Sequence, residues 1–324
     1  MLRVGVIGVG SMGQNHARVY SEIADLIGVH DAIRESSRRV AERFGVGSFE
    51  NLDDLLDRVD VISVCTPTSY HFDVAKKVMS KGISLLVEKP FTGKSKEADE
   101  LGKLAEKKGV TLASGFIERF NPIVSVARDA VREGRLGKVI SISSRRVSSF
   151  PSRVRDVGVI MDLGIHDVDV IRHITASEVI SVYAVGGRYQ NTSFEDHANI
   201  VMEMGDGTIG LVEVNWLTPM KVRKVTMTCS AGYAQLDYTD QSMELSSAKV
   251  QELDPSDMFH IPLEYDLRRV SVKKEEPLKR ELSDFLDAVE KGRAPYVTAT
   301  DAAQNLKVCE AAMESLRIGA KIKL

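Results

Sequence analysis

Four ionisable side chains in the segment 159–174, VIMDLGIHDVDVIRHI, have the clearest potential for chemistry. An α-helix would place Asp162, His166, Asp169 and His173 within roughly 60° of one another, because they are spaced i, i+4, i+7 and i+11. A carboxylate one turn from an imidazole orients the ring and favours its protonated form, which suits proton transfer from an alcohol. The segment therefore predicts an acid–base pair formed by Asp162 and His166.

Two other interpretations of this stripe remain open. A solvated or capped helix face could carry the same residues, although such faces usually present Lys and Glu. Alternatively, Asp162 and His166 could share a zinc or iron ion, with Asp169 or His173 as a third ligand. We expect no metal ion, because the dinucleotide-binding motif described next indicates a cofactor that can accept hydride without one.

The N-terminal segment 4–13, VGVIGVGSMG, has the spacing of a dinucleotide-binding turn. Gly8 would allow the tight turn, Gly10 would let the backbone approach a pyrophosphate, and Gly13 would let the first helix pack closely on its strand. Asp31 ends the next apolar run, where a carboxylate can bond a ribose 2′-hydroxyl. The residues expected to bind the dinucleotide from these segments are Gly8, Gly10, Ser11, Met12, Gly13 and Asp31.

Arginines near Asp31 leave the choice between NAD and NADP partly open. Arg34, Arg38 and Arg39 follow the acid and could accept a 2′-phosphate, whereas the Asp31 carboxylate would repel it. The acid favours NAD as the cofactor.

Further candidates follow the later parallel strands, at the edge where open α/β sheets bind their ligands. Lys89 lies between Glu88 and Pro90, which restrict the loop, although an ordinary surface lysine is the alternative. Thr66 and Pro67 would line the nicotinamide side, and His71 is either a cofactor contact or a polar residue at a helix end. Candidates for the cofactor site at this edge are Thr66, Pro67, His71, Glu88 and Lys89, while Arg119 and Asn121 are candidates for the substrate site.

A basic cluster precedes the Asp/His segment. Arg145, Arg146, Arg153 and Arg155 could bind an anionic substrate, because guanidinium groups match phosphate oxygens. They could equally form a row that faces solvent or another subunit. Arg145, Arg153 and Arg155 are taken as candidate substrate ligands, together with Asp169. Trp216 could stack on a base, although core packing is the stronger expectation.

The elements that must position these residues fall into two regions. Residues 1–121 alternate apolar strands with helices, which predicts a doubly wound parallel sheet. Residues 122–324 begin with a helix and continue mostly as strands, with Gly205-Asp206-Gly207 as a hairpin turn, which predicts an α+β domain with a mostly antiparallel sheet. Two helices are expected near the C-terminus, at 278–290 and 301–318, whereas residues 246–277 give no clear pattern.

Composition excludes several classes of protein. With 43 basic and 46 acidic residues among 324, the chain has a net charge of −3, which gives no field for nucleic acid or an acidic membrane. Its three cysteines are far apart and predict neither a disulfide framework nor a thiolate metal site. No apolar run approaches membrane-spanning length, and the first apolar stretch is already the glycine-rich strand, so we expect a cytoplasmic protein without a signal peptide.

Together these motifs resemble the Gfo/Idh/MocA oxidoreductases along the whole chain. The residues that carry the resemblance are VGVIGVGSMG, Glu88-Lys89-Pro90, Arg119-Phe120-Asn121-Pro122 and Asp162-Leu-Gly-Ile-His166. The resemblance implies an N-terminal Rossmann domain and NAD(P)-dependent chemistry on a ring hydroxyl or ketone of a sugar or cyclitol. It also implies that Lys89, Asp162 and His166 surround the reacting carbon. An open sheet that packs against a partner, in a homodimer or homotetramer, is a further implication.

Within the family, the stretch from Arg145 to Gly158 resembles dehydrogenases that oxidise the 3-hydroxyl of UDP-N-acetylglucosamine. The expected activity is therefore NAD-dependent oxidation of a sugar nucleotide. An inositol or free-sugar dehydrogenase of the same family is the first alternative. A protein that senses NAD without catalysis is the second, but it would have no need for Lys89, Asp162 and His166 together.

Overall fold

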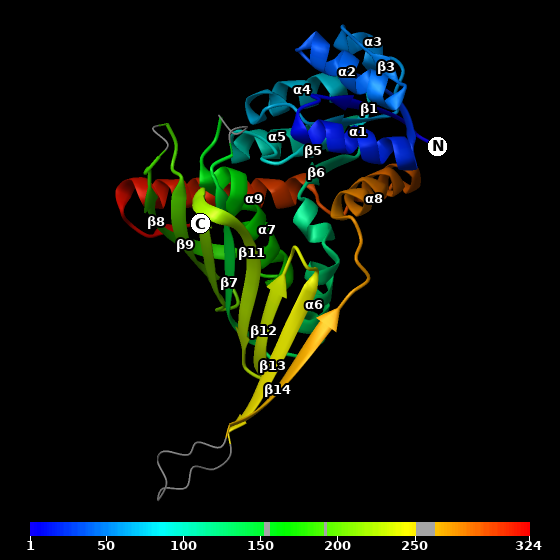
Figure 1. Cartoon of the computed structure of the whole chain (residues 1–324). Coiled ribbons are helices and arrows are strands. Elements are labelled where there is room, and N and C mark those ends of the chain that lie inside the picture. The colour runs from blue at the N-terminus through cyan, green and yellow to red at the C-terminus, as the bar shows by residue number, and fades with distance from the viewer. Residues whose placement is uncertain (152–155, 191–192, 251–262) are drawn as a thin grey trace, which may run out of the picture. The chain divides into compact units, whose positions relative to one another are not determined.

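The computed structural model describes residues 1–151, 156–190, 193–250 and 263–324. The chain divides into two compact units (Figure 1). The first unit comprises Met1–Phe120 and Glu276–Glu310, together with Asp156 and Val157. The second comprises the described residues of the segment 121–275, apart from those two, and the C-terminal Ala311–Leu324.

A six-stranded parallel sheet forms the centre of the first unit. Its spatial order is β3-β2-β1-β4-β5-β6, the doubly wound order in which the direction of winding reverses between β1 and β4. The strands are β1 (Arg3–Ile7), β2 (Asp25–His30), β3 (Gly47–Ser48), β4 (Val61–Val64), β5 (Ser84–Glu88) and β6 (Leu112–Gly115). β4 is fully buried, as expected for a parallel strand that is covered on both faces.

Helices cover this sheet, and several of them end where a glycine adopts the left-handed conformation, as at Gly45 and Gly109. The helices are α1 (Ser11–Ile23), α2 (Arg34–Phe44), α3 (Leu52–Leu56), α4 (Thr68–Ser80), α5 (Ser95–Lys108), the short η1 (Ile117–Phe120), α8 (Pro277–Lys291) and the first part of α9 (Ala299–Ile318), whose residues from Ala311 onward belong to the second unit. The parallel sheet and its helices confirm the fold class predicted for the N-terminal region.

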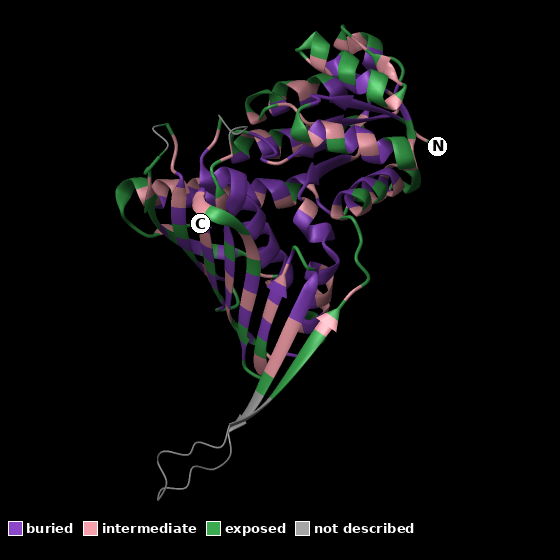
Figure 2. Cartoon of the chain, viewed as in Figure 1, coloured by how far each residue is buried: buried purple, intermediate pink, exposed green. Residues whose placement is uncertain are grey.

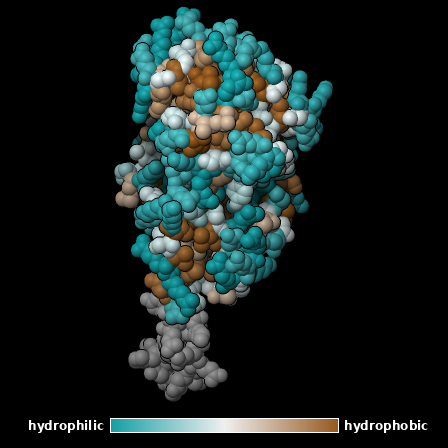
Figure 3. Space-filling view, turned by 90° about the vertical axis from the view of Figure 1, so that its right-hand side faces the viewer, coloured by the Kyte–Doolittle hydropathy of each residue, from teal (hydrophilic) through white to brown (hydrophobic). Residues whose placement is uncertain are grey.

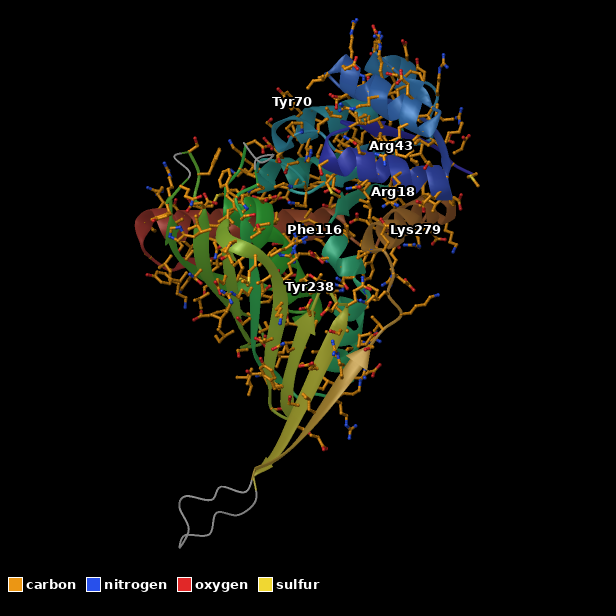
Figure 4. All side chains as sticks on the ribbon, viewed as in Figure 1. Arg18, Arg43, Tyr70, Phe116, Tyr238 and Lys279 are labelled. Atoms are coloured by element: carbon orange, nitrogen blue, oxygen red, sulfur yellow. The ribbon has the colours of Figure 1, made fainter. Side chains whose placement is uncertain are left out.

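Helix α8 joins the first unit although it lies far along the chain. Its residues Leu278, Leu282 and Phe285 enter the same core as Val4 and Tyr20. Ion pairs tie the two helices at the surface, where Arg18 of α1 pairs with Glu276 and Lys279 of α8 pairs with Glu22 (Figure 4). The sequence-based boundary at residue 121 assigned this segment to the C-terminal domain, whereas these contacts group 276–310 with the nucleotide-binding unit.

The second unit contains a nine-stranded sheet in the order β14-β13-β12-β11-β7-β10-β9-β8-β15. All of its neighbouring strands are antiparallel except β7 and β10, which confirms the prediction of a mostly antiparallel sheet. The strands are β7 (Val139–Ser149), β8 (Val179–Gly187), β9 (His197–Met204), β10 (Ile209–Asn215), β11 (Leu217–Cys229), β12 (Gly232–Asp237), β13 (Ser242–Val250), β14 (Leu263–Ser271) and β15 (Ile322–Lys323).

One face of this sheet packs against the helices of the second unit, which are α6 (Pro122–Arg132), η2 (Ile160–Gly164) and α7 (Ile165–Thr175). Burial alternates along β9 and β10, as the striping in Figure 2 shows. Apolar side chains are exposed along β8, β9 and β10, among them Ile180, Val201 and Leu211. Elsewhere, Figure 3 shows hydrophobic residues as separate patches among hydrophilic ones. The expected homo-oligomer stays a prediction.

The hairpin predicted at Gly205-Asp206-Gly207 is confirmed, since β9 and β10 pair in antiparallel fashion across it. The sequence pattern missed β12, β13 and β14. The last two of these strands lie wholly or partly within residues 246–277, for which we predicted no structure. They pair with each other, with Ser242 opposite Ser271 at one end and Val250 opposite Leu263 at the other. Both strands do alternate apolar with polar residues, as in Leu-Glu-Tyr-Asp-Leu at 263–267, so the strand period was present in the sequence and was overlooked among the many charged residues.

Two glycines that lie in helices of the first unit predict opposite effects of the same substitution. A Cβ at Gly13 would lie 1.8 Å from the carbonyl oxygen of Gly8, so Gly13→Ala forces backbone movement and should lower the free energy of unfolding by about 1–3 kcal/mol. A Cβ at Gly102 of α5 would meet only the Cβ of Ala299, at 3.6 Å. Gly102→Ala should therefore raise stability by about 0.5–1 kcal/mol.

Thermal and chemical unfolding of the two variants, without cofactor, measures these changes in the free energy of unfolding. Equal shifts in the same direction would contradict the packing argument.

Candidate active site

The glycine-rich turn has the close contacts that its predicted roles require. Gly8 adopts a φ of +83°, and a Cβ there would lie 2.7 Å from the backbone nitrogen of Thr66 after β4. Gly13 packs against the carbonyl of Gly8. A Cβ at Gly10, in contrast, would meet no described atom within 4 Å. The first and last glycines thus bring strand and helix together, while the middle one leaves open space at the start of α1.

The N-terminus of α1 fits a pyrophosphate group. Gly10 is its N-cap and makes no side-chain cap, and the first turn contains no acidic residue. Ser11 is exposed and Met12 is partly buried there. Backbone N–H groups and the positive end of the helix dipole therefore remain for an anion. This arrangement fits the dinucleotide that the sequence predicts.

Asp31 supports the glycine-rich turn. Its carboxylate accepts hydrogen bonds from the backbone N–H of Val9 (2.7 Å) and of Ile33 (2.8 Å). Of the nearby arginines, Arg34 and Arg38 both pair with Glu50, at 3.1 Å each. These exposed pairs compete with any 2′-phosphate for the two guanidinium groups.

His71 lies at the carboxyl edge of the sheet and is buried. Its Nδ1 lies 2.8 Å from the carbonyl oxygen of Pro90, and its Nε2 lies 2.8 Å from that of Thr66. Burial lowers the pKa of His71, although both carbonyls favour the protonated ring. Both ring nitrogens thus contact loop carbonyls, so His71 joins two loops. Of the predicted neighbours, Thr66 is partly buried, whereas Pro67 is exposed at the N-cap of α4.

Glu88, which precedes Lys89, belongs to a buried cluster. Its Oε1 lies 2.9 Å from Nε2 of His16 on α1, and its Oε2 accepts a hydrogen bond from the backbone N–H of Lys89 at 3.0 Å. Burial would raise the pKa of Glu88, but the hydrogen bond from His16 and the charge of Lys89 outweigh it and lower the pKa. Glu88 is therefore an ionised support for the lysine loop.

Glu281 of α8 completes this cluster. One ligand atom each from His16, Glu88 and Glu281 lies within 4.8 Å of the others, which makes them the only such group of three among the described residues. The ring nitrogen and the carboxylate oxygen of His16 and Glu88 already lie at hydrogen-bonding distance, so a proton bridges them. The Asp162, His166, Asp169 and His173 stripe does not form a metal-binding group of this kind.

The Asp/His segment differs from the uninterrupted α-helix that we predicted. It begins as a π-helical turn, η2, which contains Asp162, and continues as α7 from Ile165. The wider turn rotates Asp162 away from the position that a regular α-helix would give it relative to His166. Single π-helical turns occur frequently at functional sites.

The alternative of a solvated face is wrong for this segment. Asp162, His166, Asp169 and His173 are buried, with exposed fractions of 4%, 7%, 1% and 8%. Asp167 is buried as well and forms an ion pair with Arg146 of β7 at 2.9 Å. Ionisable groups that are buried together in this way need internal partners, which is typical of acid–base sites as well as of structural networks.

Glu195, which the sequence reasoning missed, holds the start of η2. Its backbone carbonyl accepts a hydrogen bond from Val159 N–H (3.0 Å), and its Oε1 accepts one from Ile160 N–H (3.1 Å). The carboxylate fills the space beside Gly158, where a Cβ would lie 2.1 Å from Oε1. Burial raises the pKa of Glu195. Its position beside Asp196 and His197, just before β9, gives no recognisable motif in the sequence.

The basic cluster does not act as one group. Arg145 is exposed and pairs with Glu213 of β10 at 3.0 Å, whereas Arg146, its neighbour on β7, points into the core. This alternation favours the solvent-facing alternative for Arg145. Arg153 and Arg155 lie outside the described residues.

Contacts of three other candidates favour structural roles. Arg119 is buried and pairs with Asp301 at 3.0 Å. Asn121 caps α6 through Ile123 N–H and donates to the carbonyl of Tyr238, which Figure 4 labels. Trp216 is buried with its ring edge against Phe150, so the expectation of core packing is confirmed.

Two family models match the chain in succession. Residues 2–116 match the oxidoreductase family with an NAD-binding Rossmann fold, and residues 124–235 match the GFO/IDH/MocA C-terminal domain.

The chain is also similar to curated and structurally characterised dehydrogenases. It is 33% identical over 288 residues to UDP-N-acetylglucosamine 3-dehydrogenase of Acidithiobacillus ferrooxidans, covering 89% of this chain and 88% of that protein. The solved structure of that organism's enzyme GnnA superposes with a TM-score of 0.87 at 31% identity and 97% coverage of both chains.

Scyllo-inositol 2-dehydrogenase (NAD(+)) of Bacillus subtilis is 27% identical, covering 100% of this chain and 96% of that protein. GenD2 from gentamicin A biosynthesis, solved in complex with NAD, superposes with a TM-score of 0.85 at 26% identity, covering 100% of this chain and 96% of that one.

No helix in the described part of the chain is both long and apolar enough to span a membrane. The two domain matches, the extent of the similarity and the doubly wound sheet agree with one another. The chain therefore belongs to the GFO/IDH/MocA family of oxidoreductases, as a dehydrogenase with an NAD-binding Rossmann domain.

Proposed function

We propose that this dehydrogenase uses NAD to oxidise a secondary ring hydroxyl of a sugar nucleotide, and that its substrate is UDP-N-acetylglucosamine, oxidised at the 3-hydroxyl. The observation that carries this proposal is the 33% identity, over most of both chains, to an enzyme named for that reaction. The presence of Lys89, Asp162 and His166 in this chain supports a catalytic protein over a sensor that only binds NAD.

Residues of the first unit would hold the cofactor. The N–H groups at the start of α1, next to Gly10, bind its pyrophosphate, and Asp31 bonds the adenosine ribose. Thr66 and Pro67 line the nicotinamide side. When bound, the nicotinamide supplies the two-electron oxidation by accepting hydride from the substrate carbon.

The proton and the charge on the substrate oxygen are assigned to three side chains. His166 takes the hydroxyl proton as general base, and Asp162 orients the imidazole and stabilises its protonated form. Lys89 donates a hydrogen bond to the same oxygen and stabilises the negative charge that develops on it. Asp169, buried on α7, is proposed to bind the sugar.

A cyclitol dehydrogenase is a second candidate. The 27% identity to scyllo-inositol 2-dehydrogenase extends over the whole chain. In addition, Arg145 is exposed and paired with Glu213, so one of the arginines expected to bind a diphosphate is engaged elsewhere. The two candidates share the chemistry of Lys89, Asp162 and His166 and differ in the substrate class.

Lys89→Met and His166→Asn should each lower kcat by about 10²- to 10⁴-fold, because each removes a group that handles the hydroxyl proton or its charge. The dissociation constant for NAD⁺ should stay at the wild-type value. Steady-state absorbance at the nicotinamide band and calorimetric titration measure the two quantities. Lys96→Met, at an exposed position of α5, is the matched control. Wild-type turnover in either active-site variant would refute the assigned role.

The cofactor preference follows from Asp31. The wild type should bind NAD⁺ more tightly than NADP⁺, since the carboxylate repels a 2′-phosphate. Asp31→Asn keeps an oxygen that can accept hydrogen bonds from the N–H groups of Val9 and Ile33, but it removes the charge. It should therefore bring the dissociation constants for NAD⁺ and NADP⁺ closer together. Titration of both cofactors into both proteins checks this, and tighter binding of NADP⁺ by the wild type would overturn the choice.

The substrate class can be decided by a comparison of UDP-N-acetylglucosamine, inositols and free sugars at equal concentration. We expect NAD⁺ reduction with the sugar nucleotide and competitive inhibition by UDP, because the diphosphate and base supply binding energy that a free sugar lacks. Turnover of an inositol without inhibition by UDP would instead support the cyclitol dehydrogenase.

A further inference from the structure

Two buried histidines contact the Glu88-Lys89-Pro90 tripeptide from its two ends. His16 of α1 reaches the Glu88 carboxylate at 2.9 Å, and His71 of α4 reaches the Pro90 carbonyl at 2.8 Å. The exposed fraction is 0% for His16 and 1% for His71. Lys89 lies between these anchored neighbours, and its own backbone N–H donates to Glu88.

The direction of these bonds follows from the acceptors. A carboxylate and a carbonyl oxygen accept hydrogen bonds, so Nε2 of His16 must carry a hydrogen. His71 faces a carbonyl at each ring nitrogen, so the neutral ring donates to Pro90 or to Thr66 and the protonated ring donates to both. The second nitrogen of His71 faces the carbonyl of Thr66, in the loop that also packs against Gly8. His71 therefore ties the lysine loop to the glycine-rich turn, while His16 ties it to the helix that begins there.

The electrostatics make His16 the main support of Glu88. A buried carboxylate needs a hydrogen-bonded partner, and without one it would be protonated or would turn toward water. Other titratable groups near Glu88 are Lys89, His71, Glu281, Tyr20 and Cys65. Burial and the neighbouring carboxylates raise the pKa of Tyr20 and of Cys65, so both remain neutral. His16 and the lysine loop itself thus supply the favourable interactions of Glu88.

We propose that His16 and His71 are positioning residues that hold the Glu88-Lys89-Pro90 tripeptide in one conformation and so direct the Lys89 ammonium toward the substrate oxygen. This proposal rests on the catalytic role proposed for Lys89. It assigns the two histidines neither cofactor contact nor proton transfer with the substrate.

Paired substitutions at each histidine test this role. His16→Leu removes the donor, whereas His16→Gln keeps an N–H group at the position of Nε2; His71→Leu and His71→Asn form the corresponding pair for Nδ1. Each leucine variant should lower kcat on the order of 10- to 100-fold, because a small displacement of a catalytic group has effects of this size. The amide variants should recover most of the loss, and the NAD⁺ dissociation constant should remain unchanged throughout.

Amide hydrogen exchange of the apo protein provides a readout that does not depend on activity. The N–H of Lys89 is bonded to Glu88, so exchange in the peptide that contains Lys89 should be faster in His16→Leu than in the wild type. His16→Gln should restore the protection.

Tyr20→Phe is the matched control. It lies on α1 one turn after His16, is equally buried, and loses a 2.8 Å hydrogen bond to Ser63 that does not touch the lysine loop. It should lower the melting temperature and leave kcat unchanged. If the histidine variants lower the melting temperature but leave kcat unchanged, as Tyr20→Phe should, the positioning role is wrong.

A double variant separates this inference from the proposed function. In a Lys89→Met background, His16→Leu should cause no further loss of kcat, since its effect acts through Lys89. Full activity of Lys89→Met alone would refute the catalytic proposal; an inactive Lys89→Met with a fully active His16→Leu would refute only the positioning. Stoichiometric zinc in the purified wild type that is lost in His16→Leu would replace the positioning role with a metal site.

Discussion

The close contact between Gly13 and the carbonyl of Gly8 is the constraint on which the nucleotide-binding unit depends. It fixes the first helix against the end of β1, while Gly8 in turn packs against the chain leaving β4. One turn along the same helix, His16 consequently reaches Glu88 at the end of β5. The glycine-rich turn thereby does more than leave open space at the start of α1, because it also sets the distance between α1 and the lysine loop.

The second unit buries a helix that is rich in charged residues. Asp167 is paired with Arg146, and the start of the helix is held by Glu195. The π-helical turn changes the direction of Asp162 relative to the residues of α7. Both units therefore place polar groups inside by giving them internal partners, and both do so beside residues to which we assign chemistry.

Much of this could be predicted from the sequence, for identifiable reasons. Apolar runs and glycine spacing report on local structure, so they indicated the doubly wound sheet and the turn around Gly8. The π-helical turn at Asp162 could not be predicted, because one extra residue per turn does not change the local amino-acid composition. The opposite directions of Arg145 and Arg146 depend on the register of β7, and His16 is a partner of Glu88 only through the tertiary fold.

Helix α8 has a consequence for how the protein is made. The core of the nucleotide-binding unit includes Leu278, Leu282, Phe285 and Leu286, which are synthesised after the part of the second unit that precedes residue 276. During translation, the first 120 residues therefore emerge with part of their apolar surface uncovered until the ribosome has added the last sixth of the chain. Chaperones that recognise exposed apolar segments have their longest opportunity to bind there, at the face formed by Val4, Val19 and Tyr20.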